Sequence, residues 1–255
     1  MKKLFLFSTM LIALSANSSP AVDIEKAKAT GNCENCDFSG QSLVSADLSG
    51  VKADGSKFIN VDFSGAMIED CGECDFSGSK GVGLKAEKAS LDEAVFNNCD
   101  LTGAKMKNAY IHNSRFVDAN LTDADMRTTT ISKARFSRAI LNGTDFSGAT
   151  CKRTDFSNAK MSKVNFTYAN LAYASFDNCE LSGSIFKGAD LTGTDFSGAK
   201  LRGADFRGAD VRRSVYSEAN GFDIATQRDG KVMVSIKCSD LKKVGALYDE
   251  NTKCD

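Results

Sequence analysis

From Leu91 to Tyr216 the chain places one large residue at every fifth position without interruption. All but one of these positions hold a large apolar or aromatic side chain, and the exception is Cys151. A small residue stands two places before most of them. A helix would spread residues spaced by five around its circumference, and a flat strand would alternate them between its faces. The chain must therefore turn a corner once in every five residues, as a solenoid does.

The identity of these large residues repeats with a period of 20, which predicts four sides to each coil. Three sides would mix Leu91, Met106, Leu121 and Phe136 in one column, whereas four sides give columns of like residues that pack in one repeating rotamer. One predicted column is entirely aromatic and contains Phe96, Phe116, Phe136, Phe156, Phe176, Phe196 and Tyr216.

Several units carry a family resemblance, among them ADLTG at 189–193, TDFSG at 194–198 and ADFRG at 204–208. They resemble the A-(D/N)-L-x-x unit of pentapeptide-repeat proteins, and the resemblance covers roughly residues 36–220. It implies an all-β, right-handed quadrilateral β-helix, which agrees with the four columns. For function it implies little, because members of the family have many roles.

The segments outside the regular repeats are predicted to cap the solenoid. Residues 22–35 form an N-terminal capping segment, with a short helix that has Asp23 as its N-cap and ends at Gly31. The repeats occupy 36–220, with a register break near 70–90. The remaining predictions are a loop at Ser79–Gly83 within that break, and a C-terminal cap at 221–255 with a strand at 231–238 and a short helix at 239–247.

Residues 1–21 have the pattern of a secretory signal peptide. A basic pair precedes an apolar run that ends at Ala16, and small residues follow. The run is too short to span a bilayer, and no later segment is apolar enough to do so. We expect the mature chain to begin between Asn17 and Val22 and to be periplasmic or secreted.

The overall charge argues against two classes of function. The chain has 32 basic and 33 acidic residues, so its net charge is −1, and loss of Lys2 and Lys3 with the signal peptide makes it −3. Such near-neutrality favours neither a nucleic-acid partner nor an acidic surface that imitates nucleic acid.

Two of the cysteine pairs have the spacing C-x-x-C, and each is followed by the sequence DFSG: Cys33 with Cys36, and Cys71 with Cys74. Zinc or redox chemistry is one interpretation. However, the two pairs are almost two coils apart, roughly 9–10 Å along the axis, which is too far for four sulfurs to share one zinc ion. A redox motif would open a helix rather than a β-coil. Local disulfides or inert thiols are the favoured interpretation.

The other cysteines divide into two groups. Cys238 and Cys254 flank the predicted C-terminal cap, and we expect them to form a disulfide that holds it closed. Cys99, Cys151 and Cys179 fall on inward positions of the repeats, which predicts buried, unpaired thiols.

No catalytic, cofactor-binding or metal-binding residues are predicted. The only histidine, His112, falls at a corner without a partner at a catalytic spacing, and the interior is filled by the chain's own side chains. Tyrosine and arginine favour interfaces, and both occur on the outer positions of the later coils. The candidate partner surface consists of Tyr168, Tyr173, Arg202, Arg207, Arg212 and Arg213.

Two functions of different class remain. The first is a non-enzymatic, exported scaffold whose outer faces meet a protein or envelope partner, with an end-to-end homodimer as a further possibility. The alternative, implied by the family resemblance, is a gyrase-binding mimic of DNA like the quinolone-resistance members, which needs a strongly acidic surface. A polysaccharide-cleaving β-helix enzyme would need an outer cleft of clustered charged residues, which the pattern does not show.

Overall fold

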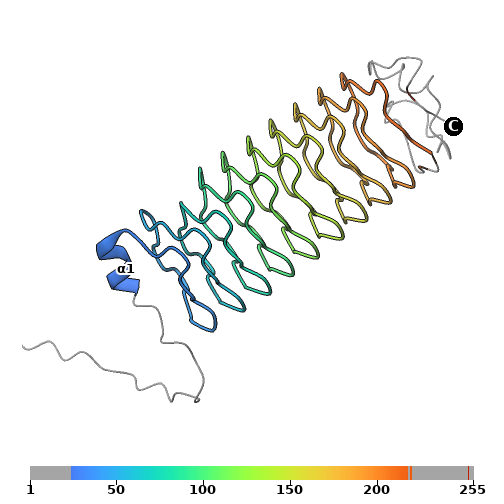
Figure 1. Ribbon diagram of the computed structural model, residues 1–255. Helices are drawn as coiled ribbons and strands as arrows, with labels where there is room; N and C mark the ends of the chain where they lie inside the picture. The colour runs from blue at the N-terminus through green and yellow to red at the C-terminus, as the bar shows by residue number, and fades with distance from the viewer. Residues whose placement is uncertain (1–23, 218, 220–251, 253–255) are drawn as a thin grey trace, which may run out of the picture.

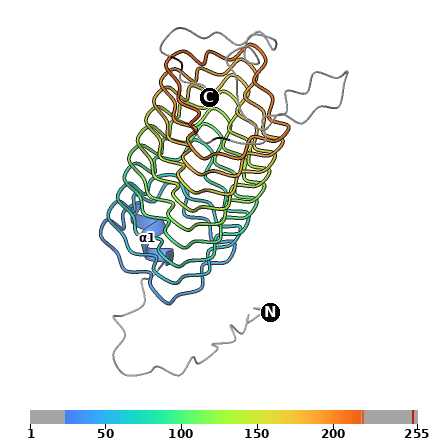
Figure 2. The same ribbon diagram turned by 90° about the vertical axis from the view of Figure 1, so that its right-hand side faces the viewer.

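The computed structural model describes residues 24–217, 219 and 252. They form an elongated stack of coils, with the helix α1 (Ile24–Thr30) at the amino-terminal end (Figure 1). In the view turned by 90° the coils follow one another along a single axis (Figure 2). The helix lies where the sequence predicted it, and Gly31 follows it with a φ of 65°. The predicted signal peptide, the N-cap Asp23 and nearly all of the predicted C-terminal cap lie outside the described residues.

Parallel backbone pairing joins each coil to the next. The pairs are isolated β-bridges such as Val95 with Arg115 and Arg115 with Arg135, and the described residues contain no longer strand. Over most of the solenoid their spacing is 20 residues, and each five-residue unit makes one side and one corner. The 20-residue period predicted from the sequence is therefore confirmed.

Each unit uses its backbone N–H groups in a fixed way. In the unit that begins at Phe96, the N–H groups of Phe96 and Asn98 donate to carbonyls of the next coil at 2.7 and 3.0 Å. The N–H of Cys99 closes the corner by donating to the Phe96 carbonyl at 3.2 Å, and Asp100 donates to the preceding coil at 3.0 Å. Asn98 has a φ of 58°, as the third residue of a type II turn does.

One backbone N–H of the unit remains, that of its second residue, and in many units it donates to a side chain. The Asp75 carboxylate accepts from the N–H of Ser77 at 2.9 Å, and the Asn165 amide oxygen accepts from that of Thr167 at 3.0 Å. This local bond leaves no backbone donor of the corner unpaired. The same contact recurs at Asp37, Asp47, Asp62, Asp100, Asn120, Asp145, Asp190 and Asp195. The aspartates of the repeat therefore have a structural role.

The predicted aromatic column is confirmed, and it is longer than predicted. Phe96 and Phe116 stack with ring centroids 4.8 Å apart, and the column ends with Phe196 on Tyr216 at 5.0 Å. Towards the N-terminus it continues through Phe76 and Phe58 to Phe38. Rings of the adjacent Phe166 column meet it edge to face, an arrangement that aromatic pairs favour.

The register break is a shortened side between Met67 and Asp70, nearer the N-terminus than the loop expected at 79–83. Asp47 pairs with Met67 at a spacing of 20, but Lys52 pairs with Asp70 at a spacing of 18. The spacing of 20 returns where Asp70 pairs with Ser90. One side has therefore lost two residues. The columns of large inward residues continue across it, but the small inward position before Cys71 is missing, since Glu69 is exposed there.

The prediction of a loop at Ser79–Gly83 is wrong, because this unit is packed like its neighbours. Ser79 is buried, and its hydroxyl donates to the Phe58 carbonyl. Gly81 occupies a large inward position, and the Phe63 ring of the preceding coil fills the space: a Cβ on Gly81 would lie 2.2 Å from Phe63 Cε2. Leu84 is fully buried in the position that is small elsewhere.

We expect Gly81→Ala to destabilise the protein even though it adds an apolar group to the core. The added methyl collides with the Phe63 ring, and overpacking of this kind costs about 1–3 kcal/mol. Urea denaturation of the variant measures the loss. The double variant Phe63→Leu, Gly81→Ala should lose less free energy of unfolding than the two single variants lose together. Additive costs would contradict the proposed filling of the Gly81 position by Phe63.

The capping aspartates should make the protein acid-sensitive. Hydrogen bonds from the side chain and backbone of Ser64 hold the pKa of Asp62 below its ordinary 3.8, and the serines two residues on do the same for Asp37 and Asp47. Their stabilising contribution is present above the unfolded-state pKa and is lost as the pH falls through the lower folded-state pKa.

The triple variant Asp37→Asn, Asp47→Asn, Asp62→Asn tests this, because Asn120 and Asn165 show that an amide makes the same cap. We expect stability near that of the parent at neutral pH and a shallower loss on acidification, measured by urea denaturation as a function of pH. Asp123→Asn is the control, since the Asp123 carboxylate has no hydrogen bond among the described residues. An unchanged acid dependence in the triple variant would contradict the assignment.

Candidate functional site

The corners of the solenoid, rather than its interior, hold the side chains available for binding. From Leu91 to Tyr216 the large inward side chains are at most 1% exposed. At each corner two consecutive residues face outward, and the second has a positive φ over most of the chain. The same corner recurs every 20 residues, so corner side chains form columns parallel to the axis.

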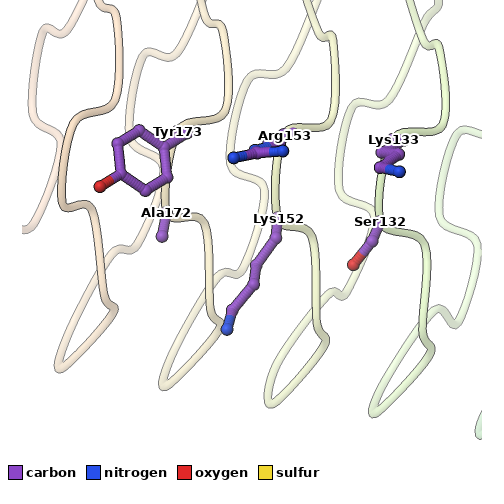
Figure 3. Close-up of a pocket in the computed structure, with 6 residues that line it drawn as sticks. All are labelled: Ser132, Lys133, Lys152, Arg153, Ala172 and Tyr173. Atoms are coloured by element: carbon purple, nitrogen blue, oxygen red, sulfur yellow. The ribbon is translucent and has the colours of Figure 1, made fainter.

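One corner contains a shallow groove of about 400 Å³ that crosses three successive coils. Figure 3 shows Lys133, Arg153 and Tyr173 in one row along the axis. A second row beside it completes the lining with Ser132, Lys152 and Ala172. We call this the basic groove.

Within the described residues, the three cations of the basic groove have no acidic partner in a salt bridge. Lys133, Lys152 and Arg153 are exposed, and none forms a salt bridge within the part of the chain that the structure describes. Elsewhere the same chain compensates its corner arginines: Arg127 binds Asp125 at 2.6 Å, Arg138 binds Asp118 at 2.7 Å, Arg207 binds Asp205 at 2.6 Å. The basic groove is thus a local concentration of positive charge on a nearly neutral protein.

Arg115 and Arg135, on the adjoining side, extend the positive charge. The nearest carboxylate on that side is Asp155. Although burial acts against it, hydrogen bonds from Ser137 and Ser157 and the charge of Arg135 lower the pKa of Asp155, so the group is ionised at neutral pH. It offsets part of the charge of Arg135, but it forms no salt bridge with Lys133, Lys152 or Arg153.

Tyr173 forms the end wall of the basic groove. The residue is 54% exposed, and the Arg153 guanidinium lies 6.0 Å from the ring centroid. On the other side the ring lies against Gly193 of the next coil, where an added Cβ would be 2.7 Å from it. Gly193 therefore makes room for the ring, and Arg153 and Tyr173 support each other through a cation–π contact.

Carboxylates stand at the same corner beyond both ends of the basic groove. Asp92 and Glu93 occupy it two coils before Lys133. Asp190 and Asp195 flank it one coil after Tyr173. The positive stretch is therefore short, with acidic positions on both sides along the axis.

The partner surface expected from the sequence is spread over different corners. Arg202, Arg207 and Arg212 follow successive inward positions of one coil, so they lie at three different corners. Arg207 and Arg212 are moreover paired with Asp205 and Asp210. Tyr168 and Tyr173 lie at adjacent corners, and Tyr173 shares its corner with Arg213 two coils away.

Sequence reasoning missed Lys133, Lys152 and Arg153, although a signal was present. The second corner residue, taken at intervals of 20, spells Glu93, Asn113, Lys133, Arg153, Tyr173, Gly193 and Arg213. Grouping charged residues by proximity in sequence, rather than by this period, selected the last coils instead.

Both C-x-x-C pairs form disulfides, Cys33 with Cys36 and Cys71 with Cys74, with Cα atoms 5.4 Å apart in each. In each pair the first cysteine holds a large inward position and the second the next small one. The Cys71–Cys74 pair is fully buried and directly follows the shortened side. Cys238 and Cys254 lie outside the described residues, so their disulfide stays a prediction.

Cys99, Cys151 and Cys179 are buried and free, as predicted. Burial raises the pKa of the Cys99 and Cys179 thiols to about 12, and it also raises the pKa of Cys151. The Cys179 thiol lies 2.9 Å from the Phe156 carbonyl one coil earlier, a contact that buried hydroxyls such as that of Ser114 also make.

His112 lies at the corner of its coil, where its backbone N–H donates to the Asp92 carboxylate at 2.7 Å. Within the described residues no group of three or more His, Cys, Asp or Glu side chains is arranged to hold a metal ion. The described residues also include no helix with the length and apolarity needed to cross a bilayer.

Two family models match most of the solenoid. The model described as "Pentapeptide repeat region" matches residues 89–166. The model described as "Pentapeptide repeats (8 copies)" matches 32–67, 149–188 and 174–213. The first of these segments ends at Met67, where the shortened side begins. No curated protein matches the chain in sequence.

Solved structures align with this chain at under 30% identity, and that of QnrB1 is similar in fold. QnrB1, a plasmid-mediated fluoroquinolone resistance protein, is 21% identical with a TM-score of 0.55, over 86% of this chain and 94% of that one. HetL, a pentapeptide repeat protein involved in heterocyst differentiation regulation from the cyanobacterium Nostoc sp. strain PCC 7120, is 20% identical with a TM-score of 0.42, over 84% and 100%. A pentapeptide repeat protein from the Arabidopsis thaliana thylakoid lumen is 29% identical with a TM-score of 0.28, over 45% and 82%.

Among the described residues, we expect no cysteine of the native, oxidised protein to react quickly with a thiol reagent. Four cysteines are in disulfides, and burial keeps Cys99, Cys151 and Cys179 protonated and inaccessible, even at pH about 9. Denaturation without reductant should then release three thiols if Cys238 and Cys254 are bonded and five if they are not. Fast labelling of a repeat cysteine in the native state, located by peptide mapping, would contradict the burial.

Proposed function

The chain belongs to the pentapeptide-repeat family, and we propose that it is a non-enzymatic, exported scaffold that binds a partner protein through its outer corners. The observation that carries the proposal is the basic groove, where exposed cations without acidic partners adjoin an exposed tyrosine. Tyrosine and arginine are enriched at protein interfaces. From the family we also infer that the coils are right-handed.

The filled interior supports a binding role in preference to catalysis. An enzyme needs a concave site with polar groups that converge on a substrate. Here the inward positions are occupied by stacked side chains, and the repeated aspartates cap backbone N–H groups. The remaining Ser, Thr and Asp side chains recur with the period of the coil rather than converging on one point.

The disulfides support export. Thiols are kept reduced in the cytosol of most cells, whereas disulfides form in the periplasm and outside the cell. Two separate pairs in the first coils, together with the signal-peptide pattern of residues 1–21, favour folding in an oxidising compartment.

A gyrase-binding mimic of DNA is less well supported. It requires a strongly acidic surface in the cytoplasm, and many aspartates here are engaged in caps or paired with arginine. The likeness to QnrB1, at 21% identity, concerns the fold only. The groove proposed as the binding site has the opposite sign of charge.

Site-specific photo-cross-linking in cells of the source organism tests the proposal. A photoreactive phenylalanine analogue replaces Tyr173 in the basic groove or Tyr168 at the adjacent corner. The two positions are matched, since both have a positive φ, are exposed and lie against a glycine of the next coil. We expect a protein adduct from position 173 and little from 168, with the mature chain in the periplasmic or extracellular fraction.

Recovery of the protein in the cytoplasm, with its N-terminal methionine and leader retained, would overturn the export part of the proposal. Absence of an adduct at both positions, in cells where the protein is folded and abundant, would overturn the binding part. An adduct from position 168 alone would place the partner at a different corner.

A further inference from the structure

We propose that the basic groove binds a short acidic segment of the partner protein, with the segment lying along the solenoid axis. The inference rests on the proposed function and names the chemistry that the partner presents. It is carried by three features of the structure: the uncompensated cations, the acidic positions at both ends of the groove, and the shape of the groove.

The cations are placed where they repel one another. Lys133 and Arg153 occupy the same corner of consecutive coils, roughly 5 Å apart in the backbone, and Lys152 stands beside them. Like charges on directly neighbouring strands are destabilising. Carboxylates of a bound segment would remove this repulsion, as Asp125 and Asp118 do for Arg127 and Arg138.

The length of the positive stretch selects a short segment. From the coil of Arg115 to that of Tyr173 there are three coil spacings, about 14 Å, which an extended chain spans with about four residues. This length also includes Asp155 on the adjoining side, beside Arg135. A long, uniformly charged polyanion, such as a nucleic acid or an acidic polysaccharide, would run over Asp92 and Glu93 at one end and Asp190 at the other. Those carboxylates repel it, whereas a segment of about four acidic residues ends before it reaches them.

The lining of the basic groove fits a peptide. Ala172 is 7% exposed and leaves the floor open, and the Ser132 hydroxyl can donate to a carboxylate or a peptide carbonyl. The exposed ring of Tyr173 closes one end, where a residue next to the acidic stretch can pack on it. Arginine in this position adds bidentate hydrogen bonds to carboxylates.

Fluorescence anisotropy with the folded mature chain tests the proposal. The probe is a labelled peptide of four consecutive glutamates between Gly-Ser linkers, and the same peptide with four glutamines is its control. We expect saturable binding of the glutamate peptide only, weakened between about 50 mM and about 200 mM salt because exposed charges are screened. The double variant Lys133→Glu, Arg153→Glu should lower the affinity about tenfold or more.

The control places a single charge reversal at another corner and is compared with the single variant Lys133→Glu, which changes the charge by the same amount. Lys163 has the same corner position and a φ of 58°, against 62° for Lys133. Lys163→Glu should bind the peptide like the parent. Glu93 occupies this backbone conformation in the same column as Lys133, with a φ of 62°, so glutamate is compatible with the fold there. A thermal melt of each variant verifies folding.

Three outcomes would overturn the inference: no binding of the glutamate peptide, equal loss in the Lys163→Glu variant, or much tighter binding of single-stranded DNA or a sulfated polysaccharide than of the short peptide. The last would identify a general polyanion surface.

If position 173 still cross-links a protein while the peptide fails to bind, the proposed function stands and only the acidic-segment inference fails. If the peptide binds but no adduct forms in cells, the groove chemistry stands and the cellular role fails.

Discussion

Hydrogen bonds between successive coils determine most of this structure. Three of the five backbone N–H groups in a unit donate to a neighbouring coil, and a fourth closes the corner, as the unit at Phe96 shows. These bonds hold the coils at one spacing, so the residue at each inward position always meets the equivalent residue of the next coil. The core is therefore a set of columns, and its packing is decided within each column.

The sequence predicted the parts of the fold that follow from strict periodicity. The 20-residue period and the aromatic column from Phe96 to Tyr216 could be derived because each unit has the same geometry. The prediction failed at Gly81, where packing depends on a residue one coil earlier. The Phe63 ring fills that position, and Leu84 compensates at the small one, so size is conserved across two coils rather than within one unit. A pattern of single units does not show such an exchange.

The basic groove was missed because its residues are about 20 positions apart, and charged residues were grouped by proximity along the chain rather than by that period. Lys133, Arg153 and Tyr173 become neighbours only when the coil is closed, and the arginines that cluster in the last coils are separated by it. Whether a corner cation is compensated depends on its acidic neighbours, as Arg207 beside Asp205 and Lys133 without such a partner show. Charge composition alone carries none of this information.

The shortened side between Met67 and Asp70 has a consequence for how such a chain can grow. Loss of two residues shortened one side and removed one small inward position, yet the columns of large inward residues stayed continuous. Internal duplication of any 20-residue block within the regular region adds a complete coil and leaves the neighbouring contacts in phase. A coil that contains the shortened side adds only 18 residues and carries the shortened side with it. The shortened side therefore limits how the chain can lengthen. A duplication is structurally neutral only when the copied block lies wholly to one side of it.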